Sequence, residues 1–424
     1  MATAVTSSSA GVTTKASSST ANFIRGQEPV PSLLNHYRGH KGPITSLCFH
    51  PNLQTLFSSS CDGYIMCWNY RKETRALRFE GHCGPVNEVN LSRYGDLMLS
   101  ASDDGTARVW VPIINGQYIS VKAHNGAVRT ACFNPVDSTI FATGGNDKTV
   151  KLWAVQAAKM KSGVTKFKSH DFIRSYRSHK NWIQSVRFSP DGNLLCSASD
   201  DKTVKIFDIR EKGECIASLN CDLGSPLYAE FNPCGSSYIG VASSQNAFLM
   251  YDVRERKLIQ SYVNLFNGPV TSFTFHPSGD FAVCVSEETK IKILDLIEGR
   301  PIFTLYGPRK GIGATAFNAN GNLFATGGKD EEVLIWEPTL LPYESAKDDE
   351  EQTEKENIGG SNVDSSSSTT TSEEKSSKSA TNSKSKVDQT PAIVKSNSKN
   401  VSLDSLSRTS SATSTTPSSA SSTS

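Results

Sequence analysis

Residues 178–207 read SHKNWIQSVRFSPDGNLLCSASDDKTVKIF, and this stretch is one unit of a pattern that fills residues 31–338. It includes Ser189-Pro190-Asp191-Gly192, with proline second and glycine fourth, as a type I turn prefers. Its last five residues, 203–207, alternate in period two and are rich in β-branched side chains, which is typical of a strand. The unit therefore predicts short β-strands joined by tight turns.

The unit recurs seven times at a nearly constant spacing. An aromatic or apolar residue closes each unit, and the successive separations are 42, 43, 54, 44, 43 and 42 residues. These closing residues are Trp68, Trp110, Trp153, Phe207, Tyr251, Leu294 and Trp336. A repeat of this length that contains four short strands indicates one blade of a β-propeller. The longer third separation, between Trp153 and Phe207, predicts a polar, lysine-rich loop insertion at residues 157–171.

Four side chains recur at fixed places in the units and resemble the His, Ser or Thr, Asp and Trp of WD repeats. That resemblance implies an all-β fold, a seven-bladed WD40 propeller over residues 31–338, in which these side chains form a hydrogen-bond chain within each blade. The residues are His40, Ser58, Asp62 and Trp68; His82, Ser100, Asp104 and Trp110; His124, Thr143, Asp147 and Trp153; His179, Ser197 and Asp201; and Thr326, Asp330 and Trp336.

The same histidine, serine and aspartate set could also be taken for a hydrolase triad. Four evenly spaced copies favour a scaffold, because catalysis needs one exposed nucleophile in a cleft. Residues 307–313 superficially suggest a phosphate loop, but the Lys-Ser/Thr ending is missing. The sequence therefore predicts no enzyme, no cofactor, no metal site and no small-molecule substrate.

The last unit ends at Trp336 without a fourth strand. Leu34 and Tyr37 precede Gly39-His40 as Ala76 and Phe79 precede Gly81-His82. We therefore expect the N-terminal segment to supply the missing strand and close the ring.

The two ends of the chain differ from the repeats in composition. Residues 339–424 begin with an acidic stretch, and more than half of positions 361–424 are Ser or Thr. Such a tail buries too little apolar area to offset about 1–2 kcal/mol of backbone entropy per residue. We predict disorder for residues 1–30 and 339–424.

Charge, apolar runs and cysteines exclude several classes of protein. The formal net charge is +2 overall and +4 for residues 31–338, which gives no polyelectrolyte bias toward nucleic acid. No apolar stretch approaches the roughly 18 residues of a membrane helix, and the first 25 residues lack the apolar core of a secretory signal. The ten cysteines fit neither a disulfide framework nor a zinc site. We expect an intracellular protein with reduced thiols and no membrane insertion.

Loop residues are the candidates for partner binding. Trp182 stands in a linking loop where other units have Pro, Ala or Gly, and aromatic side chains often anchor interfaces. Arg309 and Lys310 lie in the equivalent loop of the last unit. Packing on a neighbouring loop is the alternative for Trp182, and a solvated surface is the alternative for the two basic residues.

Three segments, residues 108–113, 178–207 and 275–307, resemble the "proteome of centriole" WD-repeat family. The most distinctive stretch is 293–300, ILDLIEGR. The resemblance implies a scaffold of centrioles and basal bodies that supports centriole assembly, length or stability and cilium formation, with centriole proteins and tubulin or microtubules as partners. It places the protein in the cytoplasm, in the cytoskeleton at the centrosome and basal body. Members of the family commonly end in a coiled coil, and no sustained heptad occurs in this tail.

A different class of function stays open, because propellers host many functions. The chain could be a WD40 adaptor, such as a ubiquitin-ligase substrate receptor or a chromatin-complex subunit.

Overall fold

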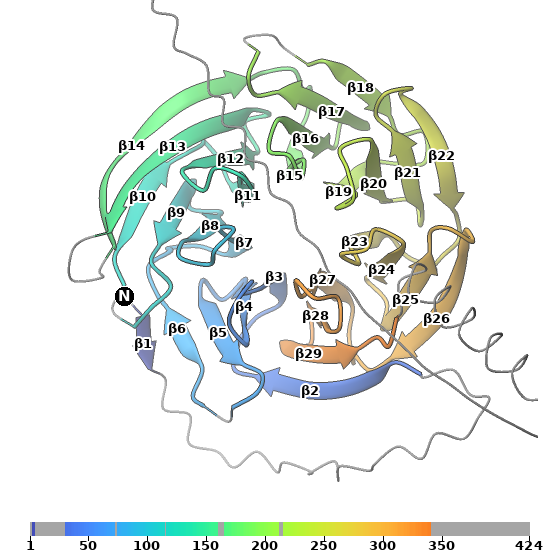
Figure 1. Cartoon of the computed structure of the whole chain (residues 1–424), viewed down its shortest axis with the longest axis horizontal. Helices are drawn as coiled ribbons and strands as arrows, with labels where there is room; N and C mark the ends of the chain where they lie inside the picture. The colour runs from blue at the N-terminus through green and yellow to red at the C-terminus, as the bar shows by residue number, and fades with distance from the viewer. Residues whose placement is uncertain are drawn as a thin grey trace, which may run out of the picture. The chain divides into compact units, whose positions relative to one another are not determined.

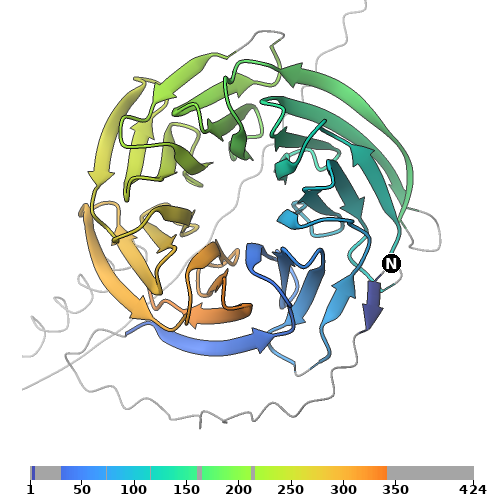
Figure 2. The same cartoon turned by 180° about the vertical axis from the view of Figure 1, so that it is seen from behind.

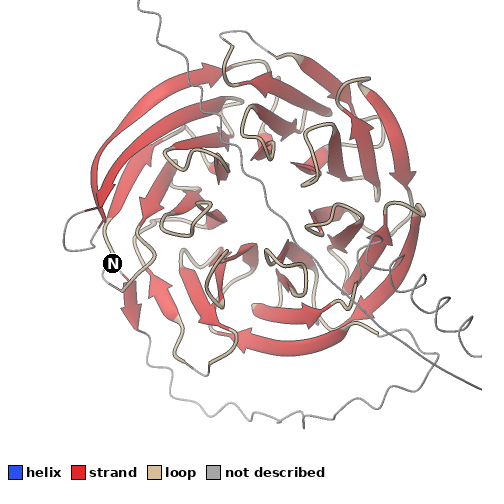
Figure 3. Cartoon of the chain, viewed as in Figure 1, coloured by secondary structure: helices blue, strands red, loops and turns tan. Residues whose placement is uncertain are grey.

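The computed structural model describes residues 2–4, 30–72, 74–114, 116–159, 165–211 and 215–340. All regular secondary structure in these ranges is β-strand (Figure 3). Seven sheets surround a central axis like the blades of a propeller (Figures 1 and 2). The predicted all-β, seven-bladed fold is confirmed.

The first four blades follow one another along the chain. Blade one contains β3 (Ile44–Phe49), β4 (Thr55–Ser60), β5 (Ile65–Asn69) and β6 (Leu77–Phe79). Blade two contains β7 (Val86–Leu91), β8 (Met98–Ser102), β9 (Thr106–Trp110) and β10 (Tyr118–Lys122). Blade three contains β11 (Val128–Phe133), β12 (Ile140–Gly145), β13 (Val150–Lys159) and β14 (Thr165–Tyr176). Blade four contains β15 (Ile183–Phe188), β16 (Leu194–Ser199), β17 (Thr203–Asp208) and β18 (Ala217–Asn220).

The last three blades complete the ring. Of these three, the seventh takes one strand from the N-terminal part of the chain. Blade five contains β19 (Pro226–Phe231), β20 (Tyr238–Ser243), β21 (Phe248–Asp252) and β22 (Lys257–Tyr262). Blade six contains β23 (Val270–Phe275), β24 (Phe281–Ser286), β25 (Lys290–Asp295) and β26 (Arg300–Tyr306). Blade seven contains β27 (Ile312–Phe317), β28 (Phe324–Gly328), β29 (Glu332–Glu337) and β2 (Ser32–Arg38).

The hydrophobic core lies between neighbouring blades. One buried cluster joins Leu47 and Trp68 of blade one to Val333 and Ile335 of blade seven, and similar clusters fill the other interfaces. Each sheet is therefore covered on both faces by its neighbours, which explains why strands such as β24 are buried at every position. Removing one blade would expose two apolar faces.

Strand β2 closes the ring, as the sequence predicts. It pairs antiparallel with β29 from Ser32 opposite Glu337 to Arg38 opposite Glu332. Its side chains also reach blade one, where the Tyr37 ring packs 5.4 Å from the Trp68 ring and Asn35 Nδ2 donates to the Tyr70 carbonyl at 3.0 Å. The strand thus joins the first and last blades.

Two details differ from the sequence prediction. Residues Ala2–Ala4 form β1, which pairs antiparallel with β6, within the segment 1–30 for which we predicted disorder. The remainder of the predicted disordered segments, apart from Val30, Thr339 and Leu340, lies outside the described residues. The edge of the short strand β6 offers unpaired backbone groups, and strand pairing needs no particular side chains.

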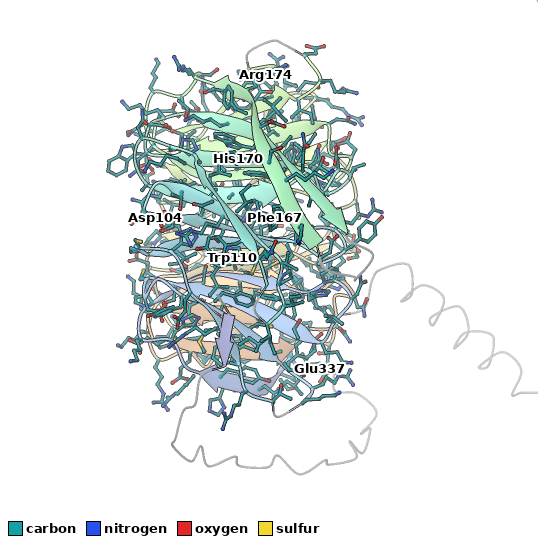
Figure 4. All side chains as sticks on the ribbon, turned by 90° about the vertical axis from the view of Figure 1, so that its left-hand side faces the viewer. Asp104, Trp110, Phe167, His170, Arg174 and Glu337 are labelled. Atoms are coloured by element: carbon teal, nitrogen blue, oxygen red, sulfur yellow. The ribbon has the colours of Figure 1, made fainter. Side chains whose placement is uncertain are left out.

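The predicted loop insertion is wrong for most of its length. Residues 157–159 and 165–171 extend β13 and β14 into a long hairpin, paired from Val150 opposite Tyr176 to Lys159 opposite Thr165. Its outer strand runs beside β10 of blade two, and Phe167 packs against the core between blades two and three (Figures 1 and 4). Apolar contact with the neighbouring blade favours strand over loop in this lysine-rich segment.

Removal of β2 is expected to open the ring. Deletion of residues 1–38 should lower the free energy of unfolding by on the order of 5 kcal/mol, because several ladder hydrogen bonds and the contacts of Tyr37 disappear. Deletion of residues 1–28 removes β1 but keeps β2 and serves as the control. Urea denaturation measures both, and equal midpoints would contradict closure by β2.

Candidate protein-binding surfaces

A hydrogen-bond chain runs through blade one from the surface to the core. His40 Nδ1 lies 2.9 Å from Asp62 Oδ2, and His40 Nε2 lies 2.7 Å from Ser58 Oγ. Trp68 Nε1 donates to the same Ser58 oxygen at 2.8 Å. Because the ionised Asp62 carboxylate only accepts, Nδ1 of a neutral His40 carries the proton and donates to it. Nε2 then accepts the Ser58 O–H, and the Ser58 oxygen accepts the indole N–H. All four groups are satisfied with a neutral imidazole.

The chain recurs as the sequence predicts, with losses where residues are replaced. Blade four lacks the indole donor because Phe207 replaces Trp, and blade seven keeps the Trp336 to Thr326 bond at 3.0 Å without a histidine. The complete or nearly complete sets are His82, Ser100, Asp104 and Trp110; His124, Thr143, Asp147 and Trp153; and His179, Ser197 and Asp201.

The aspartates also hold the loops of one face of the ring. Asp62 accepts the backbone N–H of Lys41 at 2.9 Å and that of Tyr64 at 3.0 Å, so it ties the loop carrying His40 to its own turn. Asp330 accepts the Arg309 N–H at 3.1 Å in the same way. Burial acts to raise the pKa of Asp62, but the bonds from His40 and the backbone outweigh it and lower the pKa. We call this face, made of the histidine and aspartate loops, the upper face.

The hydroxyls of these chains are inaccessible. Ser58, Ser100, Thr143 and Ser197 each have 0% of their surface exposed. Burial lowers the pKa of His82, which keeps the imidazole neutral and bonded in place. This geometry fits a scaffold, as the four copies in the sequence indicate.

Blades two and four provide a matched test of this role. Ser100→Ala leaves His82 Nε2 and Trp110 Nε1 without their shared partner, while His82 Nδ1 keeps its bond to Asp104. The change should cost about 2–4 kcal/mol of stability, since each buried polar group without a partner costs about 1–3 kcal/mol. Ser197→Ala leaves only His179 Nε2 without a partner and should cost about half as much. Urea unfolding of both variants checks this, and an equal or larger loss for Ser197→Ala would contradict the proposed chain.

The inner strands line a central channel and are linked by side chains. Each begins with a β-bulge, as between Ile44 and Ser46 of β3, which turns two successive side chains toward the channel. Thr45 Oγ1 donates to the Val86 carbonyl at 2.6 Å, and Glu88 Oε2 accepts the Ala131 N–H at 2.9 Å. Similar bonds pass from blade to blade and satisfy inner-edge backbone groups that have no partner strand.

The upper mouth of the channel presents an aromatic side chain beside a basic one. Trp182, in the loop before β15, is 45% exposed, and the Arg129 guanidinium lies 6.0 Å from its ring. Arg129 Nε also donates to Asn146 Oδ1 at 3.1 Å, which fixes its direction. Arg129 lines an upper cavity of about 160 Å³ together with Asn87, Gln184 and Thr271. Trp182 packs on Arg129 of the neighbouring blade and stays accessible, so its role in partner binding stays a prediction.

The other two candidates do not join this site. Arg309 and Lys310 are exposed in the loop between β26 and β27, on the upper face of blade seven, across the ring from β15 (Figure 1). Equivalent loops of different blades point the same way but lie at different angles around the axis. A single small ligand could not contact both sites.

A charged cluster inside the channel was not predicted from the sequence. Arg187 of blade four forms an ion pair with Glu88 of blade two, and its Nε donates to Tyr228 Oη of blade five at 3.1 Å. The Tyr228 hydroxyl donates weakly to Glu230 Oε2 at 3.5 Å. Burial, aided by the negative charge of Glu88, raises the pKa of Glu230 to about 7 despite Arg187. The sequence did contain a signal for this cluster. Arg187 and Glu230 are charged at a position of the inner strand where other blades have Cys48, Cys132, Thr274 or Ala316.

This raised pKa predicts a pH-dependent change in stability. Between the ordinary pKa near 4.5 and the folded value near 7, the folded state binds more protons, so stability falls as pH rises through this window. Glu230→Gln should therefore stabilise the ring above pH 7 by up to about 3 kcal/mol and leave it unchanged below pH 4.5. Thermal unfolding at pH 4.5 and 8 measures this, and a gain independent of pH would contradict the assignment.

Other kinds of site receive no support from the described residues. No group of three His, Cys, Asp or Glu in them could hold a metal ion. No described helix has the length and apolar character to span a membrane. The ten cysteines, all described, are free thiols.

Known proteins resemble this chain over the ring. The nuclear distribution protein PAC1 of Arthroderma otae is 25% identical over 290 residues, 61% of this chain and 59% of the relative. The serine-threonine kinase receptor-associated proteins of Gallus gallus and Homo sapiens are 26% and 25% identical over 307 residues, 71% of this chain and 81% of each relative. The chain thus spans about three fifths of the length of the first of these relatives.

A family profile follows the blades. The profile described as WD40, WD domain, G-beta repeat, matches residues 31–69, 73–111, 116–154, 170–208, 259–295 and 299–337. Each match combines the outer strand of one blade with the inner three of the next. The unmatched unit holds β20 and β21 of blade five, where Val241 and Gln245 replace the serine and aspartate of the hydrogen-bond chain. With more than half of its residues matched, the chain belongs to the WD40-repeat family.

Proposed function

We propose that this WD40 propeller is a non-enzymatic adaptor that binds other proteins through its upper face. The observation that carries the proposal is the pair formed by exposed Trp182 and Arg129 at the channel mouth. Tryptophan and arginine dominate interface hot spots, and a held guanidinium loses little freedom on binding. The hydrogen-bonded loops around them offer a surface that is already ordered.

The names of the relatives support the general form of this proposal. The serine-threonine kinase receptor-associated proteins are named for association with another protein. The nuclear distribution protein is named for a cellular process. An adaptor role therefore has wider support than any particular location.

The specific form that we propose is a scaffold of centrioles and basal bodies, with centriole proteins or tubulin as partners. It rests on the resemblance of residues 108–113, 178–207 and 275–307 to that family, of which the most distinctive stretch is 293–300. In the structure residues 293–300 form the end of β25 and the turn to β26, where Asp295 Oδ1 accepts the N–H groups of Ile297 and Glu298 at 2.9 and 2.8 Å. Ile297 is 57% exposed at this turn and offers a contact away from the upper face.

Imaging tests location and contact surface together. The tagged full chain should concentrate at centrioles, and Trp182→Ala should weaken partner binding roughly 30-fold, the effect of about 2 kcal/mol at a hot spot, and so reduce that signal. Tyr306→Ala, which changes a side chain 69% exposed on the outer strand β26, is the control and should localise normally.

Two outcomes would contradict separate parts of the proposal. A diffuse or nuclear signal for the unaltered chain removes the centriolar role and leaves the general adaptor role. Centriolar signal of equal strength for Trp182→Ala removes the upper-face anchor.

A further inference from the structure

The channel opens on its lower face, opposite the histidine loops, into a cavity of about 450 Å³. Its walls are largely aromatic, from the ends of five inner strands: Phe49, Phe188, Phe231, Phe275 and Phe317. Five prolines of the turns that follow inner strands add to this lining. The wall is apolar and rigid, because the phenylalanines are packed between blades and proline fixes its own backbone angle.

Glu230 is the acidic residue in this wall. It belongs to a cluster in which two carboxylates, Glu88 and Glu230, share one guanidinium. The Arg187 guanidinium donates from Nη2 to Glu88, from Nε to Tyr228 Oη, and from Nη1 to the Val186 carbonyl at 2.8 Å. Glu230 is left with one long bond from Tyr228, at 3.5 Å. Where Glu230 is ionised, as at pH 8, the cluster therefore carries an excess negative charge on the side of the cavity.

The turns around the cavity have the same sign of charge. The seven turns that join the first and second strands of the blades contain four aspartates, Asp96, Asp137, Asp191 and Asp280, and a single arginine, Arg93. Acidic loops around an apolar opening favour the approach of a cation over that of an anion.

We propose that the lower cavity binds a lysine or arginine side chain of a partner protein, with its charged end at Glu230 and its aliphatic stem against the phenylalanines and prolines. Such side chains are amphipathic and match a wall of this kind, and a cation beside aromatic rings gains further attraction. A neutral apolar side chain would bury the Glu230 carboxylate without a new partner, which is costly. This site lies on the face opposite Trp182 and does not depend on the adaptor surface described above.

Small probes of matched shape can test the cavity directly in the full chain. n-Butylguanidinium reproduces the arginine side chain, and n-butylurea is its neutral counterpart. A ligand of this size is expected to bind in the millimolar range. Calorimetry at pH 8 should show at least tenfold tighter binding of n-butylguanidinium than of n-butylurea.

Variants then assign the effect to one carboxylate. Glu230→Gln should weaken binding of n-butylguanidinium at least tenfold and leave n-butylurea unchanged. Glu255→Gln removes an exposed acid in the turn between β21 and β22, also on the lower side, and should bind like the unaltered chain. Equal affinity for the two probes, unchanged binding in Glu230→Gln, or no binding of n-butylguanidinium up to about 10 mM would each overturn the proposal.

Discussion

The antiparallel ladder between β2 and β29 is the contact on which the rest of the ring depends. Every blade buries both faces against its neighbours, so an open arc would leave the apolar faces of blades one and seven in water. The ladder joins residues 32–38 to residues 332–337, and Tyr37 and Asn35 link it to blade one. This ladder between residues far apart in the sequence thus closes a ring in which strands β3 to β29 otherwise pair locally.

Different interactions stabilise different blades of the ring. Blades one to four fix their upper loops with buried hydrogen-bond chains. Blades five and six lack these chains and pack aromatic side chains instead, as where Phe248 meets Phe273 at 4.8 Å between ring centroids. The inner strands add bonds from blade to blade, such as that from the Phe133 N–H to Asn90 Oδ1 at 3.0 Å. The loops on the upper face therefore rest on rigid supports, as a binding surface requires.

The sequence predicted what repeats can encode. Spacing alone indicated seven blades, and the missing last strand indicated closure by residues before Gly39. It could not predict the hairpin of β13 and β14, because its stability comes from contact of Phe167 with another blade. It also missed the meeting of Glu88, Arg187 and Glu230, which stand in three different units. A repeat fixes each residue's place within its blade, whereas contacts across the channel depend on side-chain reach between blades.

The long hairpin of β13 and β14 makes one part of the ring's outer edge different from the rest. Seven similar blades around an axis would offer a partner seven equivalent outer surfaces. The hairpin of β13 and β14 extends alongside blade two and carries Phe172, whose side chain is 55% exposed, so this part of the rim differs from the others. A partner that contacted this hairpin would therefore meet the ring in a single rotational orientation.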